Sequence, residues 1–187
     1  ERAYGLQIAG LSNHVGDMGR GVAIAGLANT TLGSYYGVQL GGLWNYTSLD
    51  TKGLMIGGLA NWVNSGFDGL QLGGLANITR DARAIQIAGL TNISKDIYGL
   101  QLSGLANISR DAYGLQLAGL SNVSHDLYGM QLAGLFNCAK DVYGLQFAGL
   151  VNVAKRARGV QFATILNVAE ESDFPIGLIN IIKQGDK

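Results

Sequence analysis

The sequence is poor in the residues that carry most catalytic, metal-binding and disulfide chemistry. It contains one Cys, one Pro and two His in 187 residues. A single Cys excludes an internal disulfide and a cysteine-rich zinc site. Charge is scarce and balanced, with 13 Lys and Arg against 13 Asp and Glu, so no net field favours nucleic acid or an anionic membrane. No apolar run approaches the ~20 residues of a membrane-spanning helix.

What the sequence has instead is a repeat that fills it. The clearest copies are 98–112 and 113–127, which both begin Tyr-Gly-Leu-Gln-Leu. An Asn marks the register of every copy: Asn13, Asn29, Asn45, Asn61, Asn77, Asn92, Asn107, Asn122, Asn137, Asn152, Asn167 and Asn180. The first four intervals are 16 residues, the next six are 15 and the last is 13. We therefore expect a single repeat domain over 1–187, with a capping coil at 168–187 where the spacing shrinks.

Each copy has the features of short strands joined by glycine corners. Two glycines per copy, such as Gly114 and Gly119, would each destabilise a helix by about 1 kcal/mol relative to Ala. Leu115-Gln116-Leu117 alternates with the period of two that is typical of strands. The residue lost between the 16- and 15-residue copies lies between the Asn and the next Gly, which indicates a turn there. The pattern predicts an all-β fold: a parallel β-solenoid (β-helix or β-roll) of about twelve 15–16-residue coils.

Stacked coils would bring equivalent residues into ladders along the axis. The aliphatic residues on either side of each Gln, such as Leu115 and Leu117, are predicted to point inward, and so is the Leu that follows the second Gly. A further apolar column is predicted to complete the core: Ile78, Ile93, Ile108, Val123, Cys138, Val153 and Val168. The Asn ladder is predicted to be structural, because stacked amides can hydrogen-bond from coil to coil.

Two ladders are candidate binding surfaces. The glutamines lie between leucines that are predicted to point inward, so they are expected to face outward: Gln86, Gln101, Gln116, Gln131 and Gln146. The tyrosines of four consecutive copies are expected to stack beside them: Tyr98, Tyr113, Tyr128 and Tyr143. Amide and aromatic stacking on a solvated face is the structural alternative. A regular surface for a glycan chain or ice is the functional one, although ice binding would favour a Thr array that this stripe lacks.

An apolar strip is the third candidate. The residue after the recurring Leu varies widely in size, which favours an outward face, and its C-terminal members are large and apolar: Phe136, Val151 and Leu166. Trp44 and Trp62 extend the same character toward the other end. Exposed strips of this kind commonly mark contact with a partner or a membrane. The alternative is that these residues point inward or are covered.

Catalysis is not expected. An enzyme needs convergent, non-repeating groups, and His14 and His125 belong to no recurring constellation. Cys138 occupies a column otherwise filled by Ile and Val, which favours a core residue over a nucleophile. The basic residues beside the Asp column, as in Arg110-Asp111, are typical of local charge neutralisation on an exposed turn. We therefore expect no enzyme, no cofactor and no metal.

The motif Gly-Leu-Gln-Leu-Ala-Gly-Leu-x-Asn, found at 114–122 and with Phe for the second Leu at 144–152, resembles the short glycine-rich repeats of bacterial surface-repeat proteins. The resemblance covers essentially the whole chain. It implies a bacterial cell-surface or secreted location and no particular chemistry.

These observations predict a non-enzymatic surface or secreted β-solenoid that acts as a structural or adhesive binding module. Two alternatives stay open: a secreted effector or toxin that engages a protein or a membrane through the apolar strip, and an ice- or polysaccharide-binding face. The expected partners are protein or glycan surfaces and not nucleic acid. Membrane contact through the apolar strip and self-association through the N-terminal edge stay open as well.

Overall fold

The chain is built from strands that run parallel to their neighbours. The computed structural model describes residues 1–183, and within them no helix is present that could cross a membrane. The prediction of a parallel β-solenoid of about twelve coils is confirmed. Its strands are β1 (Ala3–Ala9), β2 (Ser12–Val15), β3 (Gly19–Ala25), β4 (Ala28–Thr31), β5 (Tyr35–Gly41), β6 (Trp44–Thr47), β7 (Thr51–Gly57), β8 (Ala60–Gly73), β9 (Ala76–Ala88), β10 (Thr91–Ser103), β11 (Ala106–Ala118), β12 (Ser121–Val123), β13 (Asp126–Ala133), β14 (Phe136–Ala148), β15 (Val151–Ala163), β16 (Leu166–Ala169), β17 (Glu171–Ile176) and β18 (Ile179–Ile182).

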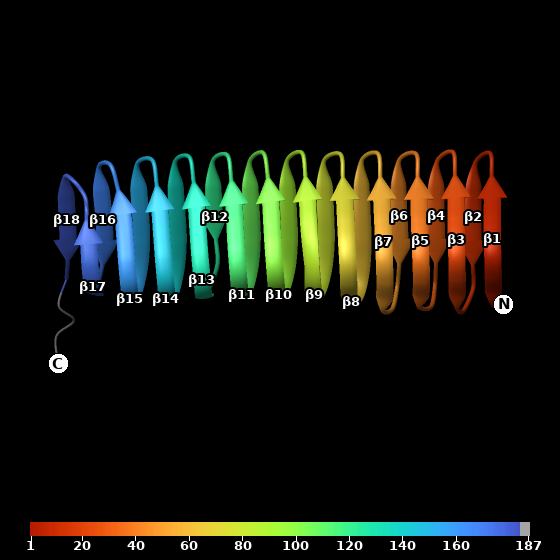
Figure 1. The fold of residues 1–187 in the computed structure, drawn as a ribbon, viewed down its shortest axis with the longest axis horizontal. Coiled ribbons are helices and arrows are strands. Elements are labelled where there is room, and N and C mark those ends of the chain that lie inside the picture. The colour runs from red at the N-terminus through yellow and green to blue at the C-terminus, as the bar shows by residue number, and fades with distance from the viewer. Residues whose placement is uncertain (184–187) are drawn as a thin grey trace. The chain divides into compact units, whose positions relative to one another are not determined.

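The chain divides into two compact units, Glu1–Lys95 and Asp96–Lys187. In the first unit, β1 pairs with β3 and β3 with β5, while β2 pairs with β4 and β4 with β6. The strands of each unit thus form two layers, which Gly-Leu turns join at the top of Figure 1. The register is that of the repeat: Asn13 lies beside Asn29 in the first unit, and Asn122 beside Asn137 in the second.

The predicted packing of the leucines is wrong, because the buried face of each strand is the one that carries the Gln and the Asn, together with apolar residues such as Ile97 and Leu127. The glutamines between the leucines are fully buried, and Gln101 and Gln131 are 0% exposed. The Leu after the second Gly is exposed instead, as at Leu105 (43%), and so is the apolar column after the Asn, as at Ile108 (41%). Adjacent residues of a strand point to opposite faces, so burying the Gln turns both flanking apolar residues outward.

The interior accepts glutamines because the nearest inward positions of the same strand are small. In β11, the residues on the same face as Gln116 and nearest to it are Gly114 and Ala118. Ser109 Oγ lies within hydrogen-bonding distance of the Gln amide. The next inward position is larger in other coils, since the fully buried Leu127 lies opposite Ala112. The Gln is therefore buried where small neighbours leave room for it and where its amide finds hydrogen-bond partners.

The Asn ladder forms as predicted and ties the coils together. Asn122 Nδ2 donates to the carbonyl of Leu132 at 2.7 Å and to Asn137 Oδ1 at 3.0 Å. The pattern recurs one coil later, where Asn137 Nδ2 donates to Asn152 Oδ1 at 3.0 Å. Every Asn of the ladder from Asn29 to Asn167 is buried. Both of these bonds from Asn122 reach the next coil, one to its backbone and one to its Asn, which fixes the register of stacking.

One glycine column is required by the close approach of successive coils. Gly129 has a φ of +142°, a conformation that side chains rarely adopt, and a Cβ placed there would lie 2.1 Å from the carbonyl oxygen of Gly114. The same relation holds one coil on, between Gly144 and Gly129. The recurring Tyr-Gly step therefore lets the backbone of one coil rest directly on that of the coil before.

The last described coil departs from the repeat. β17 pairs with β15 through a register shift between Ala157 and Val160, and Pro175 occupies the position opposite Gln161. The Gln ladder ends there, because Ser172 Oγ donates to Gln161 Oε1 at 3.0 Å in place of another amide. Of the predicted capping coil, 184–187 lie outside the described residues.

Candidate functional site

The glutamines that sequence reasoning placed on a binding face cannot contact a partner. Gln86, Gln101, Gln116, Gln131 and Gln146 are all at most 1% exposed. The prediction that they face outward is therefore wrong, for the steric and hydrogen-bonding reasons given above.

The buried glutamines form a ladder of their own in the second unit. Gln116 Nε2 donates to Gln101 Oε1 at 2.7 Å and to Ser109 Oγ at 3.1 Å. Gln131 Nε2 donates in turn to Gln116 Oε1 at 2.8 Å and to Ser124 Oγ at 2.9 Å. The amides satisfy one another inside the coil, so the glutamines belong to the packing of the molecule.

The predicted Tyr ladder is confirmed. The ring centroids of Tyr98 and Tyr113 are 4.5 Å apart, those of Tyr113 and Tyr128 are 4.8 Å apart and those of Tyr128 and Tyr143 are 4.9 Å apart, with ring planes within 3° of parallel. Partial desolvation, followed by the neighbouring tyrosines, raises the pKa of Tyr113 and Tyr128. The Arg158 guanidinium continues the column, 5.9 Å from the Tyr143 ring centroid. The ladder presents an aromatic surface with polar hydroxyls to solvent.

The predicted apolar strip is aligned. Phe136 lies beside Val151, and Val151 beside Leu166, on the strands that follow the Gly-Leu turns. Phe136 is exposed and the other two are half-buried. Sequence reasoning missed the extent of this surface, because it assigned the flanking columns to the core. The recurring Leu at the turn and the aliphatic residues on both adjoining faces belong to it as well.

In each unit this larger surface is an apolar edge, which we define as the outward side chains of one uncharged segment per coil. The segments are 6–14, 22–30, 38–46, 54–62, 70–78, 85–93, 100–108, 115–123, 130–138, 145–153, 160–168 and 174–181. All 13 basic and all 13 acidic residues of the chain lie outside these segments. The separation of charged from uncharged segments could have been used to find the apolar edge from the sequence.

The backbone of the apolar edge is hydrogen-bonded even in its turns. The amides of Leu120 and Ser121 donate to the carbonyl of Leu105 at 3.1 and 2.9 Å. The amides of Leu135 and Phe136 donate in the same way to the carbonyl of Leu120, at 3.0 and 3.1 Å. The edge therefore exposes aliphatic side chains over a backbone whose polar groups already have partners.

In the first unit, the apolar edge includes three aromatic residues that lie close together. Trp44, Tyr46 and Trp62 line a shallow pocket with the small residues Thr30 and Ala60. The Tyr46 and Trp62 rings meet edge to face, with centroids 6.3 Å apart. Asn64 Nδ2 and Ser48 Oγ donate to the Tyr46 hydroxyl at 2.8 and 3.1 Å. The hydroxyl thus points toward the polar part of the coil while the indoles remain on the apolar part.

The opposite turns carry the charges and form a charged edge. Arg156 pairs with Asp141 through two hydrogen bonds of 2.6 Å, and this guanidinium lowers the pKa of the Asp141 carboxyl. Arg110 pairs with both Asp96 and Asp111, at 2.8 and 3.1 Å. These contacts confirm that basic residues neutralise the Asp column.

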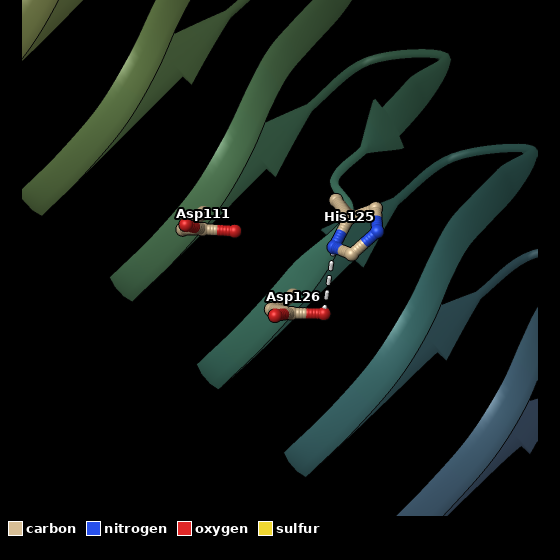
Figure 2. A group of neighbouring side chains, drawn as sticks. All are labelled: Asp111, His125 and Asp126. Atoms are coloured by element: carbon tan, nitrogen blue, oxygen red, sulfur yellow. Dashed lines mark ion pairs between the residues drawn. The ribbon is translucent and has the colours of Figure 1, made fainter.

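One cluster on the charged edge has metal-ligating side chains. Asp111, His125 and Asp126 place one ligand atom each within 4.8 Å of one another, and Figure 2 shows the imidazole directed at Asp126. His125 Nδ1 lies 2.9 Å from Asp126 Oδ1. The His125 side chain is half exposed and the Asp126 side chain is 28% exposed.

The sequence predicted that the single Cys is a core residue, and this prediction is wrong. Cys138 is half-buried on the outward column after the Asn and lines a shallow groove beside Val123 and Val153. Its partial burial raises the pKa of the thiol, which keeps it protonated near neutral pH. A thiol in that state is a poor nucleophile.

The fold and the surface together define a class: a parallel β-solenoid with buried Asn and Gln ladders, in which each unit has an apolar edge and a set of charged turns. Comparison with protein-family models, curated protein sequences and solved structures finds no match to this chain. The functional argument therefore starts from the geometry of the two edges.

Proposed function

We propose that the chain is a non-enzymatic adhesive module of the bacterial surface or of secreted proteins, and that it binds through its apolar edge. The observation that carries the proposal is the separation of all charged residues from the twelve uncharged segments. Soluble proteins rarely expose large contiguous apolar surface unless that surface makes a contact.

The regular spacing of the coils supports an adhesive role. Each coil adds the same kind of side chain at the same place, so contact energy accumulates coil by coil instead of at one anchor. Such a surface holds its partner through many weak and equivalent contacts. A substitution in one coil is expected to weaken binding modestly, and substitutions in several coils are expected to add.

The two alternative functions, an effector or toxin and a polysaccharide- or ice-binding face, depend on different parts of the surface. An effector or toxin that engages its target through Phe136, Val151 and Leu166 would use part of the same edge. The glutamines that were predicted to form a polysaccharide- or ice-binding face are buried, so such a face would depend on the Tyr ladder alone. Sugar rings do stack on aromatic faces, and a glycan array with a Tyr113→Ser and Tyr128→Ser double variant would test that use.

The proposal is tested by adsorption to alkyl-terminated and hydroxyl-terminated monolayers, followed with a quartz crystal microbalance. The test variant replaces two exposed leucines of the apolar edge, Leu59→Lys with Leu75→Lys. The matched control makes the same change on the opposite turns, Leu32→Lys with Leu49→Lys. All four leucines are 42–53% exposed and lie in the first unit.

Wild type and the control variant should adsorb to the alkyl surface, and the test variant should adsorb much less. Little adsorption to the hydroxyl surface is expected from any of them. Equal adsorption of the two variants, or no preference of wild type for the alkyl surface, would contradict an adhesive role for the apolar edge.

A further inference from the structure

We propose that the partner of the apolar edge is a lipid bilayer, into one leaflet of which the edge inserts while the charged edge stays in water. This inference rests on the proposed function and names the class of surface that it binds. Four features of the edge favour lipid over a protein or a second copy of the chain.

The first feature is that the apolar side chains of the edge point in three directions. In the second unit, Leu105 projects from the turn, Leu102 from the layer before it and Ile108 from the layer after it. These three side chains are 43, 39 and 41% exposed. A rigid protein surface would cover one of these directions and leave the others in water, whereas fluid acyl chains can surround all three.

The second feature is that the uncharged segments offer lipid few unpaired polar groups. Hydrocarbon requires that polar groups find partners within the protein. From segment 22–30 to segment 160–168, the Asn and Gln side chains are buried, and Asn122 and Gln116 bond to the neighbouring coils. The amides of the turns donate to the previous coil, as Leu120 does to Leu105. A protein interface would instead favour outward donors and acceptors, at about one hydrogen bond per 100–200 Å².

The third feature is the depth of the apolar part. From Leu100, where the apolar segment begins, to Leu105 at the turn there are five residue steps. Three of these steps lie in β10, which ends at Ser103, and at about 3.3 Å per residue they span roughly 10 Å; the bend at 104–105 forms the tip. Half of a hydrocarbon core about 30 Å thick is roughly 15 Å. The apolar part is therefore short enough to lie within one leaflet.

The fourth feature is an aromatic border between the two edges. Tyr98, Tyr113, Tyr128 and Tyr143 lie between the charged turns and the apolar segments. Tyrosine is enriched where hydrocarbon meets the headgroup region, because its ring is apolar and its hydroxyl is polar. In the first unit, the Tyr46 hydroxyl bonds to Ser48 and Asn64 on the polar side of the coil.

The experiment measures binding of the whole chain to vesicles of zwitterionic phosphatidylcholine by flotation. Wild type and the Leu32→Lys, Leu49→Lys control should float. The Leu59→Lys, Leu75→Lys variant should lose about tenfold or more in partitioning, because two ammonium groups would enter the apolar region. Raising the salt concentration should leave wild-type binding unchanged, since the charges of the chain balance. Circular dichroism spectra of all three proteins should match, which excludes unfolding as the cause.

The native tryptophans report insertion directly. Trp44 and Trp62 are the only two tryptophans of the chain, and both are about half exposed on the apolar edge. Their fluorescence should shift to shorter wavelength on vesicles and should be quenched by lipids brominated in the acyl chains. Wild type that fails to float, or floats without quenching, overturns the inference. If it nevertheless adsorbs to the alkyl monolayer, the adhesive role stands and only its lipid partner is wrong; failure in both assays overturns both.

Discussion

The polar interior makes a prediction opposite to that of an ordinary hydrophobic core. Replacing the buried Gln116 by Leu should destabilise the protein strongly, while replacing the exposed Leu120 by Gln should have little effect. Gln116 is 1% exposed and takes part in three hydrogen bonds: two donated, to Gln101 Oε1 and Ser109 Oγ, and one accepted, from Gln131 Nε2. Leu120 is 42% exposed at the turn.

The magnitude follows from these contacts. Each buried partner that loses its bond costs about 1–3 kcal/mol. Burying an additional Leu side chain returns about 1.5–3 kcal/mol of that cost. Gln131 retains its bond to Ser124, so Gln101 and Ser109 are the two partners whose bonds to Gln116 are lost without that replacement, and we expect Gln116→Leu to lose about 2 kcal/mol of unfolding free energy. Leu120→Gln should change it by less than about 1 kcal/mol.

The assay is urea denaturation followed by far-ultraviolet circular dichroism, with the midpoint and slope compared among wild type and the two variants. Gln116→Asn, which keeps the amide but shortens the side chain, should lie between wild type and Gln116→Leu. A Gln116→Leu variant as stable as wild type, together with an unfolded Leu120→Gln variant, would refute the polar interior.

Three further predictions follow from particular contacts. Gly134→Ala should cost about 1–3 kcal/mol, because its Cβ would lie 2.1 Å from a carbonyl oxygen of the preceding coil, whereas Gly10→Ala, with no atom within 4 Å, should be nearly neutral in the same denaturation assay. Arg156 lowers the pKa of Asp141, so its stabilising effect is present above the ordinary Asp value of about 3.9 and is lost as the pH falls through the lower folded value; Arg156→Gln should flatten this acid limb of stability. Burial raises the pKa of Tyr35 to about 12, so stability should fall as the pH rises from the unfolded value of about 10, and Tyr35→Phe should reduce that alkaline loss in pH-dependent melting.

The sequence was sufficient to predict the coil but not which face of each strand is buried. The Asn spacing predicted the register, and the fit of Gly129 on Gly114 explains why glycine recurs. An alternating strand has two faces, and hydrophobicity alone selects the leucines for the inside. Gly114 and Ala118, the nearest residues to Gln116 on its own face, carried the opposite information, because their small size leaves room for a buried amide. This local size pattern outweighs hydrophobicity at the Gln position, while the large Leu127 is buried at the next inward position of the following coil.

The candidate surface was predicted in part for the same reason. The alignment of Phe136 with Val151 and the stacking of the tyrosines required only the repeat period. The full apolar edge required the correct choice of buried face, since it includes the turn leucines that had been assigned to the core. The glutamines were misplaced because a buried amide is stable only when its neighbours satisfy it, and those neighbours come from other coils.

The matched hydrogen bonds between coils have a consequence for how such a chain changes over generations. Because Asn122 meets Asn137 just as Asn137 meets Asn152, a whole coil can be gained or lost while the bonds on either side remain of the same kind. Recombination between near-identical segments of the gene would produce such changes in one step. Contact strength would then be adjusted by the count of coils, with no need to redesign any of them.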